Sequence, residues 1–320
     1  MITETGHATG AIVSPKDNRD YEYGVLGSAS IPFDWDKGFD IEQKVGIMPV
    51  KDQGQTSACG GFAWASLFYV IDEKNREEMS EKFIYAHTHV GNGGSAGRTN
   101  CELCRTKGVS SKALCPLPSP LTEQAITFLG DIKEEAFKYA LDNKIKYYAR
   151  VNSNIEEVAN AIRDNGGVVL GIHGQNNGTW RTKFPLPPTS SDVWAHWVYA
   201  GKAKLINGKK YIGFLNSWGN EIGEKGWQYI GEEYFNAKWG FFENWTMTYD
   251  PQIVPPVTMP TLKMGSKGEP VKILQRALGI KDDGIFGKIT YKILMVFQKE
   301  HNLIVDGICG KATWAIIINK

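Results

Sequence analysis

The sequence predicts an α+β chain of two domains, a large mixed one followed by a small helical one, and three observations predict it. Residues 251–261 contain four prolines, which is typical of a stiff, extended linker. Beyond it a short pattern repeats at an offset of 23 residues, once over 283–290 and once over 306–313. Before it, a helical apolar pattern follows Cys59 and an apolar strand covers 168–172.

The first element of interest is a helix predicted from Gly61 to about Glu77. Its apolar residues are spaced to form one face before the charged residues that begin at Asp72, and they are Phe62, Ala65, Leu67, Phe68, Val70 and Ile71. Cys59 lies at the N-terminus of this helix, where unpaired N–H groups and the helix dipole favour an anion. A thiol attacks as the thiolate, so this position suits a nucleophile.

Three other side chains complete a cysteine hydrolase pattern. Gln53 stands six residues before Cys59, His196 lies 137 residues after it, and Asn216 lies 157 after it. We expect Cys59 to be the nucleophile and His196 the general acid/base, with Asn216 orienting the imidazole. The amide of Gln53 and the backbone N–H of Cys59 are expected to form the oxyanion hole. The alternative is that Cys59 is only a small buried hydrophobic residue.

Several blocks of sequence carry a resemblance to the papain family of cysteine peptidases. They are Ile31-Pro32-Phe33-Asp34-Trp35, Met48-Pro49-Val50-Lys51-Asp52-Gln53-Gly54, Met79-Ser80-Glu81, Gly91-Asn92-Gly93-Gly94, and Asn216-Ser217-Trp218-Gly219 with Gly223-Glu224-Lys225-Gly226-Trp227. The resemblance covers about residues 29 to 248. It implies a two-lobed papain-like fold, with a helical lobe that carries Cys59 and a β-rich lobe that carries His196 and Asn216. Residues 1–28 then form an N-terminal extension and 29–250 the peptidase domain.

The resemblance also implies the roles of further residues around the cleft. Trp218 is expected to shield the hydrogen bond between His196 and Asn216 from water. Gly93 and Gly94 are expected to offer backbone groups to an extended peptide substrate.

Three positions depart from the family pattern. The tryptophan that usually follows the nucleophile is replaced by Gly60, and Thr56 stands where a cysteine is usual. Trp197 follows the histidine, where the family usually has a small residue beside the pocket for the second residue before the scissile bond. We expect Trp197 to narrow that pocket in favour of small residues such as alanine or glycine.

The repeat in residues 262–320 consists of Asp-Gly turns, each followed by Gly-Lys-x-Thr with the threonine as a possible helix cap. One helix is predicted over 271–278 and a second over 291–298. This unit resembles the small three-helix peptidoglycan-binding domain of many cell-wall hydrolases, which implies bacterial peptidoglycan as a partner. Cys309 is expected to pack in its core. The alternative is a generic helical appendage that packs on the larger domain.

The net charge of +1 hides an asymmetry, because residues 261–320 hold ten Lys/Arg against five Asp/Glu. A basic small domain favours anionic cell-wall polymers, although a solvated lysine-rich surface explains the same count. No nucleic-acid reader motif is present, and no apolar run has the length of a membrane span. We expect no nucleic-acid partner, and a monomer.

Five cysteines, an odd number, argue against a full disulfide framework. Cys101, Cys104 and Cys115 leave a metal site or one disulfide open, but free thiols are the expectation. No metal and no cofactor is expected, because a thiol mechanism needs neither.

The N-terminus lacks the charged and apolar regions of a signal peptide. The residues before the papain-like start are too few for the inhibitory segment that the family usually carries, so we expect no autoinhibition. A cell-wall hydrolase with neither feature resembles a bacteriophage endolysin. We therefore expect a bacteriolytic enzyme that waits in the host cytoplasm and then cuts an amide bond in the wall.

Two other functions fit the same residues. One is a general cysteine protease that is tethered to the wall and digests proteins. The other is a catalytically silent wall-binding protein, which the altered run Cys59-Gly60-Gly61 favours slightly.

Overall fold

The computed structural model describes residues 2–15, 17, 20, 23, 32–73, 76–91, 93–248, 260–301, 303–310, 313, 314 and 317. Its contacts divide the chain into two compact units, residues 1–23 with 31–253, and a C-terminal unit from residue 254 onward. The predicted boundaries at residues 28 and 250, and most of the linker 251–261, lie outside the described residues. Those boundaries therefore stay predictions.

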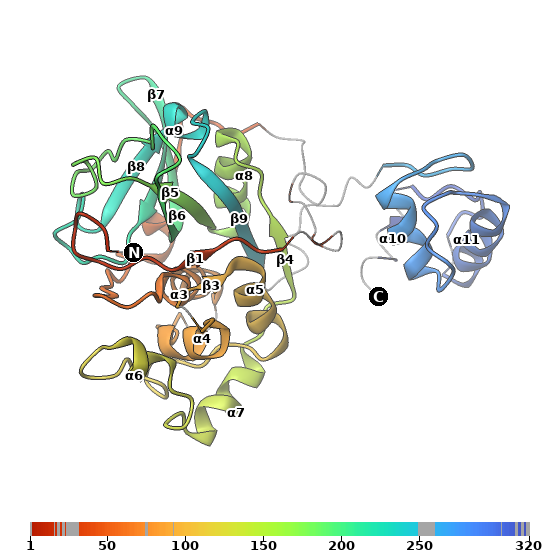
Figure 1. The fold of residues 1–320 in the computed structure, drawn as a ribbon. Helices are drawn as coiled ribbons and strands as arrows, with labels where there is room; N and C mark the ends of the chain where they lie inside the picture. Colours follow the sequence, from red (N-terminus) through yellow and green to blue (C-terminus); the bar gives the residue numbers. More distant parts are fainter. Residues whose placement is uncertain are drawn as a thin grey trace. The chain divides into compact units, whose positions relative to one another are not determined.

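The larger unit is built around an antiparallel sheet with the strand order β4-β9-β5-β6-β7-β8, to which β2 adds by pairing with β6. The strands are β2 (Phe39–Asp40), β4 (Tyr147–Arg150), β5 (Val168–Gly174), β6 (Trp194–Ile206), β7 (Lys209–Leu215), β8 (Trp227–Gly231) and β9 (Phe241–Thr248). Two short parallel strands, β1 (Ala11–Ile12) and β3 (Ser95–Ala96), pair with each other outside this sheet. In Figure 1 the red N-terminal segment that carries β1 runs between the sheet and the helical part.

The helices of the larger unit are α2 (Glu42–Val45), α3 (Cys59–Ile71), α4 (Glu81–Thr88), α5 (Gly97–Thr106), α6 (Glu123–Thr127), α7 (Glu134–Asp142), α8 (Ile155–Asn165) and α9 (Glu232–Phe235). Figure 1 shows α3 to α7 gathered on one side and the strands β5 to β9 on the other. The α+β class with a helical part and a β-rich part is confirmed.

Helix α3 joins the two parts. Its residues from Cys59 to Phe68 are all buried, so it is surrounded on every side. It ends at Ile71, and the prediction that it continues to Glu77 is wrong. The backbone leaves the helical conformation at Asp72 (φ −78°, ψ 80°), where the apolar pattern stops.

The smaller unit contains α10 (Glu269–Ala277) and α11 (Lys288–Glu300), and residues 313, 314 and 317 are also helical. Its core consists of Leu262, Val271, Leu274, Phe286, Leu294, Phe297, Cys309, Trp314 and Ile317. Cys309 is fully buried there, as predicted.

The first copy of the repeat is held together by one buried glutamine. The Nε2 of Gln275 donates to Asp283 Oδ1 (2.8 Å), the carbonyl of Ile285 (3.1 Å) and Thr290 Oγ1 (3.0 Å). Its Oε1 accepts from the N–H of Gly284 (2.9 Å). The motif therefore encodes a turn that folds back on the preceding helix.

The second copy reproduces this network atom for atom. The Nε2 of Gln298 donates to Asp306 Oδ1 (2.9 Å), the carbonyl of Ile308 (3.0 Å) and Thr313 Oγ1 (3.2 Å). Its Oε1 accepts from the N–H of Gly307 (2.9 Å). The internal repeat in the sequence is thus a repeat of structure.

The proposed capping role of the threonine is wrong for α11. The residue at its N-cap is Gly287, and no side chain caps the helix. Thr290 lies inside the helix, buried, because its hydroxyl is needed by Gln275.

None of the helices that the structure describes is both long and apolar enough to cross a bilayer. Among the same residues, no three His, Cys, Asp or Glu side chains gather closely enough to hold a metal ion. Cys101, Cys104 and Cys115 are free, buried thiols, and Cys101 Sγ accepts a hydrogen bond from Trp64 Nε1 at 3.3 Å.

Candidate active site

Cys59 is the first residue of α3 and is completely buried. Its N-cap, Ala58, has no capping side chain. Burial raises the pKa of the Cys59 thiol to about 11, and hydrogen bonds from the backbone N–H groups of Trp197, Gly10 and Gly60 to the sulfur oppose that rise. In this conformation the sulfur is therefore a protonated thiol at neutral pH.

His196 lies in β6, next in sequence to the residue whose N–H reaches the Cys59 sulfur. Its Nε2 is 2.9 Å from Asn216 Oδ1. Its Nδ1 is buried and finds no hydrogen-bond partner among the described residues. Burial lowers the pKa of His196 to about 4, the Asn216 hydrogen bond opposes this, and the charge of His7 adds to it. The imidazole is therefore neutral at pH 7.

Trp218 covers the hydrogen-bonded side chains of His196 and Asn216. Its ring stacks on that of His196 with the centroids 4.6 Å apart and 25° between the planes. The indole is itself buried, so it excludes water from the bond between His196 and Asn216, as expected of a shielding residue.

Gln53 is fully buried, and its orientation is fixed by the segment that carries Asn216. Ser217 Oγ donates to Gln53 Oε1 at 2.6 Å, and the N–H of Gln53 donates to the carbonyl of Ser217 at 2.9 Å. This leaves the amide Nε2 pointing away, where it donates to the carbonyls of Thr56 (2.8 Å) and Ala8 (3.0 Å). The side chain thus presents an N–H group that can bind a carbonyl oxygen from another segment.

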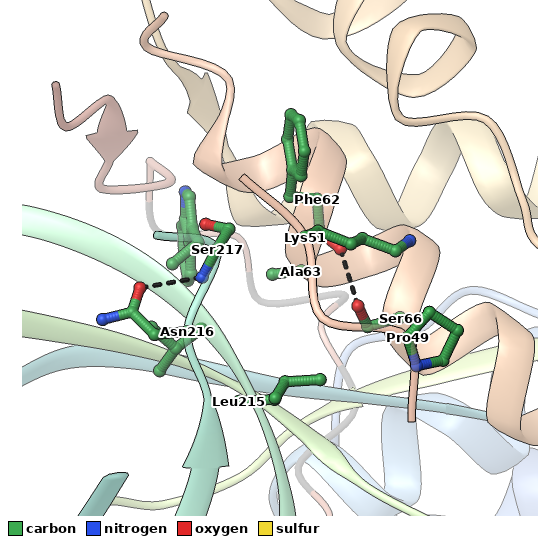
Figure 2. A pocket seen from close by; sticks show the side chains of 10 residues that line it. Pro49, Lys51, Phe62, Ala63, Ser66, Leu215, Asn216 and Ser217 are labelled. Atoms are coloured by element: carbon green, nitrogen blue, oxygen red, sulfur yellow. Dashed lines mark hydrogen bonds between the residues drawn. The ribbon is translucent and has the colours of Figure 1, made fainter. Parts of the chain in front are cut away.

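A small cavity lies behind these residues, between α3 and the end of β7. Its volume of about 10 Å³ is near the space that one water molecule needs. Figure 2 shows Asn216 and Ser217 on one side of it and Phe62, Ala63 and Ser66 on the other, with Ser217 N bonded to Asn216 Oδ1 (2.8 Å). It is too small for a substrate.

Comparison with known proteins identifies the family of this chain. Residues 32–239 match a sequence model described as papain family cysteine protease, and residues 267–317 match one described as a putative peptidoglycan binding domain. The chain belongs to the papain family of cysteine proteases. It also carries a C-terminal peptidoglycan-binding domain.

Solved structures of papain-like proteases share the fold. Xylellain from Xylella fastidiosa is 19% identical, with 78% of this chain and 98% of that chain covered and a TM-score of 0.62. Procathepsin B S9 from Trypanosoma congolense is 15% identical, with 76% and 87% covered and a TM-score of 0.63. Bromelain from Ananas comosus is 23% identical, with 67% and 99% covered and a TM-score of 0.53.

The N-terminal segment of this papain-family chain lies in the site, although its length led us to expect no inhibitory segment before the peptidase domain. We call residues 2–14 the N-terminal arm. Ala8 offers its carbonyl to Gln53, and the N–H of Gly10 reaches the Cys59 sulfur. The extension has no apolar periodicity, so its place depends on partners far along the chain that the sequence does not reveal.

The peptide-binding role expected of Gly93 and Gly94 stays a prediction, and several of their backbone groups form hydrogen bonds within their own loop. The N–H of Gly94 donates to Tyr85 Oη (2.7 Å) and its carbonyl accepts from Val90 N (3.0 Å). The N–H of Gly93 donates to the carbonyl of Val90 (2.8 Å). Both glycines thus serve their own loop, and the edge that pairs with the arm is the neighbouring strand β3.

The side chain of Trp197 lies in the core, beside the small cavity described above. Its indole is fully buried, packs edge-on against Trp64 (5.0 Å between centroids) and Phe242 (4.9 Å), and donates from Nε1 to the carbonyl of Ser95 (2.9 Å). The expected narrowing of a substrate pocket by this side chain therefore has no support in its contacts.

The space that Trp197 fills explains the missing tryptophan after the nucleophile. A Cβ at Gly60 would lie 2.2 Å from Ser95 Oγ, 2.8 Å from Asn100 Nδ2 and 3.4 Å from Trp197 Cδ1. No side chain fits at position 60 in this packing. Gly60 is thus a requirement of the packing and gives no sign of a lost catalytic function.

Sequence reasoning missed Gln228, which is fully buried in β8. Its Oε1 accepts from Asn216 Nδ2 at 2.8 Å, and its Nε2 donates to the carbonyls of Trp180 (3.0 Å) and Thr182 (2.8 Å). The only signal in the sequence is a polar residue within the otherwise apolar run from Trp227 to Ile230.

Proposed function

We propose that this papain-family protease is a peptidoglycan hydrolase of endolysin type that cuts an amide bond in the peptides of the bacterial wall. The observation that carries the proposal is the presence, in one chain, of a papain-family unit and a peptidoglycan-binding domain. The binding domain would keep the protease on its insoluble substrate and raise its local concentration there.

The first chemical step is acylation of Cys59. The Cys59 thiol gives its proton to His196, and the resulting thiolate forms a C–S bond to the carbonyl carbon of the scissile amide, whose oxygen takes the negative charge. Gln53 Nε2 and the N–H of Cys59 would bind that oxygen. His196 then gives its proton to the departing amine as the C–N bond breaks.

The second step is hydrolysis of the thioester. His196, now neutral, takes a proton from water, and the hydroxide oxygen attacks the acyl carbon. The C–S bond breaks and the acid product leaves. Asn216 Oδ1 holds the ring in the tautomer that keeps Nδ1 available, which agrees with the unpartnered Nδ1 in this structure.

The proposal includes a location: the host bacterial cytoplasm before lysis and the wall afterwards. Two observations support it. All five cysteines are free thiols, which is typical of proteins that reside in a reducing compartment. The C-terminal region is basic, with ten Lys/Arg against five Asp/Glu in residues 261–320, which suits an anionic wall.

The test is digestion of purified sacculi by the full chain and by Cys59→Ala, with mass spectrometry of the released fragments. We expect wild type to release peptides and Cys59→Ala to release none while still binding. The new termini identify the bond that is cut.

Casein serves as the comparison substrate in the same assay. Casein digestion without release from sacculi would replace the proposal with a wall-tethered general protease. A chain that binds sacculi without hydrolysing them would be a silent wall-binding protein if its Cys59 also fails to react with E-64-type inhibitors. That failure must persist when the N-terminal arm is displaced.

A further inference from the structure

Glu123 joins two segments of the peptidase unit that are far apart in the sequence. Its Oε2 accepts from the N–H of Ser57 (2.7 Å), two residues before the nucleophile. Its Oε1 accepts from the hydroxyl of Tyr85 (2.5 Å), and the oxygen of that hydroxyl accepts in turn from the N–H of Gly94 (2.7 Å). One carboxylate therefore ties the segment that leads into α3 to the loop that leads into β3.

A polypeptide main chain passes between these two segments beside the nucleophile. The N–H of Gly10, in the N-terminal arm, is bonded to the Cys59 sulfur. A Cβ built on Gly10 would lie 2.1 Å from the carbonyl oxygen of Ser57 and 2.8 Å from Gly94 Cα. Ser57 and Gly94 are therefore the two walls of a gap that is one main chain wide, and this gap lies next to the sulfur.

The substrate residue that supplies the scissile carbonyl must lie next to the same sulfur, and hence at this gap. We propose that Glu123 and Tyr85 are positioning residues that set which sizes of substrate residue the protease accepts there, because they hold the two walls at a fixed separation. The proposal rests on the papain-family protease activity and does not depend on the cell wall as the substrate.

The direction of each hydrogen bond in this chain follows from the chemistry of its members. The two backbone N–H groups can only donate, so Glu123 Oε2 and the Tyr85 oxygen must accept. Burial and the hydrogen bond to Glu123 raise the pKa of Tyr85, so its hydroxyl keeps a proton, which it donates to the second carboxylate oxygen. An ionised carboxylate accepts at both ends, whereas an amide of the same shape accepts at only one. The arrangement is therefore specific to a glutamate at position 123.

The loop that forms the second wall is a closed turn. The N–H of Val90 donates to the carbonyl of Gly94 (3.0 Å), and the N–H of Gly93 donates to the carbonyl of Val90 (2.8 Å). A Cβ built on Gly93 would lie 3.0 Å from Ser57 Oγ and 3.5 Å from Glu123 Oε1. The loop thus packs on the carboxylate and on the opposite wall, so a change at Glu123 reaches both walls.

Helix α6 carries Glu123 in its first turn and is itself fixed beside the nucleophile. Its Ile126 is completely buried and belongs to one apolar cluster with Ala58, the N-cap residue of α3. From α4, Lys82 Nζ donates to the carbonyl of Ala125 (3.1 Å). The carboxylate therefore reaches the gap from a rigid support, which precise positioning requires.

The test compares wild type with Glu123→Met, which keeps the length of the side chain and removes both acceptors. Glu134→Met is the matched control, because Glu134 also lies in the first turn of its helix and its side chain is 77% exposed. The substrates are two soluble peptides that differ only in the residue that supplies the scissile carbonyl, glycine or phenylalanine. We expect the ratio of kcat/KM for the phenylalanine peptide to that for the glycine peptide to rise about fivefold or more in Glu123→Met. It should stay unchanged in Glu134→Met.

Tyr85→Phe separates the hydrogen-bond chain from the charge of Glu123, because it keeps that charge and removes the link to Gly94. We expect it to raise the same ratio. In the double variant of Glu123→Met with Tyr85→Phe, the rise should be smaller than the product of the two single effects. A rise equal to that product would show that the two side chains do not act as one unit.

Amide hydrogen exchange of the full chain tests the proposal without turnover of any substrate. We expect the N–H groups of Ser57 and Gly94 to exchange about tenfold faster in Glu123→Met, and that of Gly94 alone to do so in Tyr85→Phe. Unchanged exchange at both amides of Glu123→Met, or an unchanged peptide ratio, would overturn the proposal.

A merely structural role for Glu123 gives a different result. Exchange would then be faster throughout the peptidase unit, and kcat/KM would fall equally for both peptides, which would also overturn the proposal. Because none of these measurements uses the wall, their failure is distinguishable from failure of the endolysin proposal.

Discussion

Gln53 and Gln228 in the peptidase unit and Gln275 and Gln298 in the peptidoglycan-binding domain are all buried, but their partners differ. The side-chain amide of Gln275 bonds to groups 8 to 15 residues away, within its own repeat. Gln53 bonds to Ala8, 45 residues away, and to Ser217, 164 away.

The two kinds of glutamine differ in whether a hydrogen-bond partner of the amide can be replaced by another group. In the small domain each amide is saturated by the turn that it folds, so it is scaffold. In the cleft one N–H of Gln53 is satisfied by the carbonyl of Ala8 in the N-terminal arm, and the carbonyl of a substrate could take that place. A buried polar group with an exchangeable partner is thus a better sign of a site than burial alone.

The largest effect that separates the two kinds of glutamine is on catalysis. Gln53→Ala should lower kcat on a soluble peptide by about 10²- to 10³-fold, because one oxyanion donor is lost. Gln275→Ala should leave that kcat unchanged. Steady-state kinetics on the full chain measure both, and a loss below fivefold for Gln53→Ala would argue against its role.

The next largest effect is on the stability of the small domain, where the glutamines of the repeats matter. Gln275→Ala and Gln298→Ala should each destabilise the small domain by about 2–4 kcal/mol, since each leaves a buried backbone N–H and other polar groups without partners. Urea unfolding followed by the fluorescence of Trp314 in the isolated domain would measure it, provided that the wild-type domain unfolds cooperatively. A large loss for one variant and none for the other would show that the repeats are not equivalent.

The buried pair Cys59 and His196 predicts a pH window for the closed peptidase unit. The pKa of His196 falls to about 4, so the unfolded chain binds more protons and stability is lost as pH falls from about 6.5 toward 4. The pKa of Cys59 rises to about 11, so stability is present below about pH 9 and is lost as pH rises through 11. Each limb is worth about 3 kcal/mol.

Thermal unfolding between pH 4 and 11 measures this window. Cys59→Ala is the control, since it should remove that thiol's share of the alkaline limb and keep the acid limb. If Cys59→Ala loses stability above pH 9 to the same extent as wild type, other groups cause that loss.

The smallest effect tests a core position where the two repeats differ, Phe286 in the first and Cys309 in the second. Cys309→Ala should destabilise the small domain by about 1 kcal/mol, because only one buried atom is removed. Ile289→Ala, at a site that is 72% exposed, should change it by less than about 0.5 kcal/mol. Calorimetry of both variants would compare them.

The sequence predicted the features that short spacings encode. Cys59 at a helix start, the Asn216-Ser217-Trp218 block and the two Asp-Gly turns all depend on neighbours within a few residues. The proximity of Gln53 to the Asn216 segment followed from the family resemblance, and the structure supplies its physical cause in the pairing of Gln53 with Ser217.

What the sequence did not predict depends on contacts between distant segments. The arm is placed by Glu243, 229 residues after Ser14, and no local pattern announces such a partner. The use of Gly94 by its own loop depends on the hydroxyl of Tyr85. The burial of Trp197 depends on the space left free above Gly60, which only the packed structure reveals.

The packing at Gly60 also couples the nucleophile to the strand that pairs with the N-terminal arm. A side chain at position 60 would collide with Ser95 and Asn100 before reaching Trp197. Room for it therefore requires a change in Ser95 or Asn100, which bond to each other, and Ser95 belongs to the strand that pairs with the arm. Any redesign of the residue after the nucleophile must for this reason repack that strand as well.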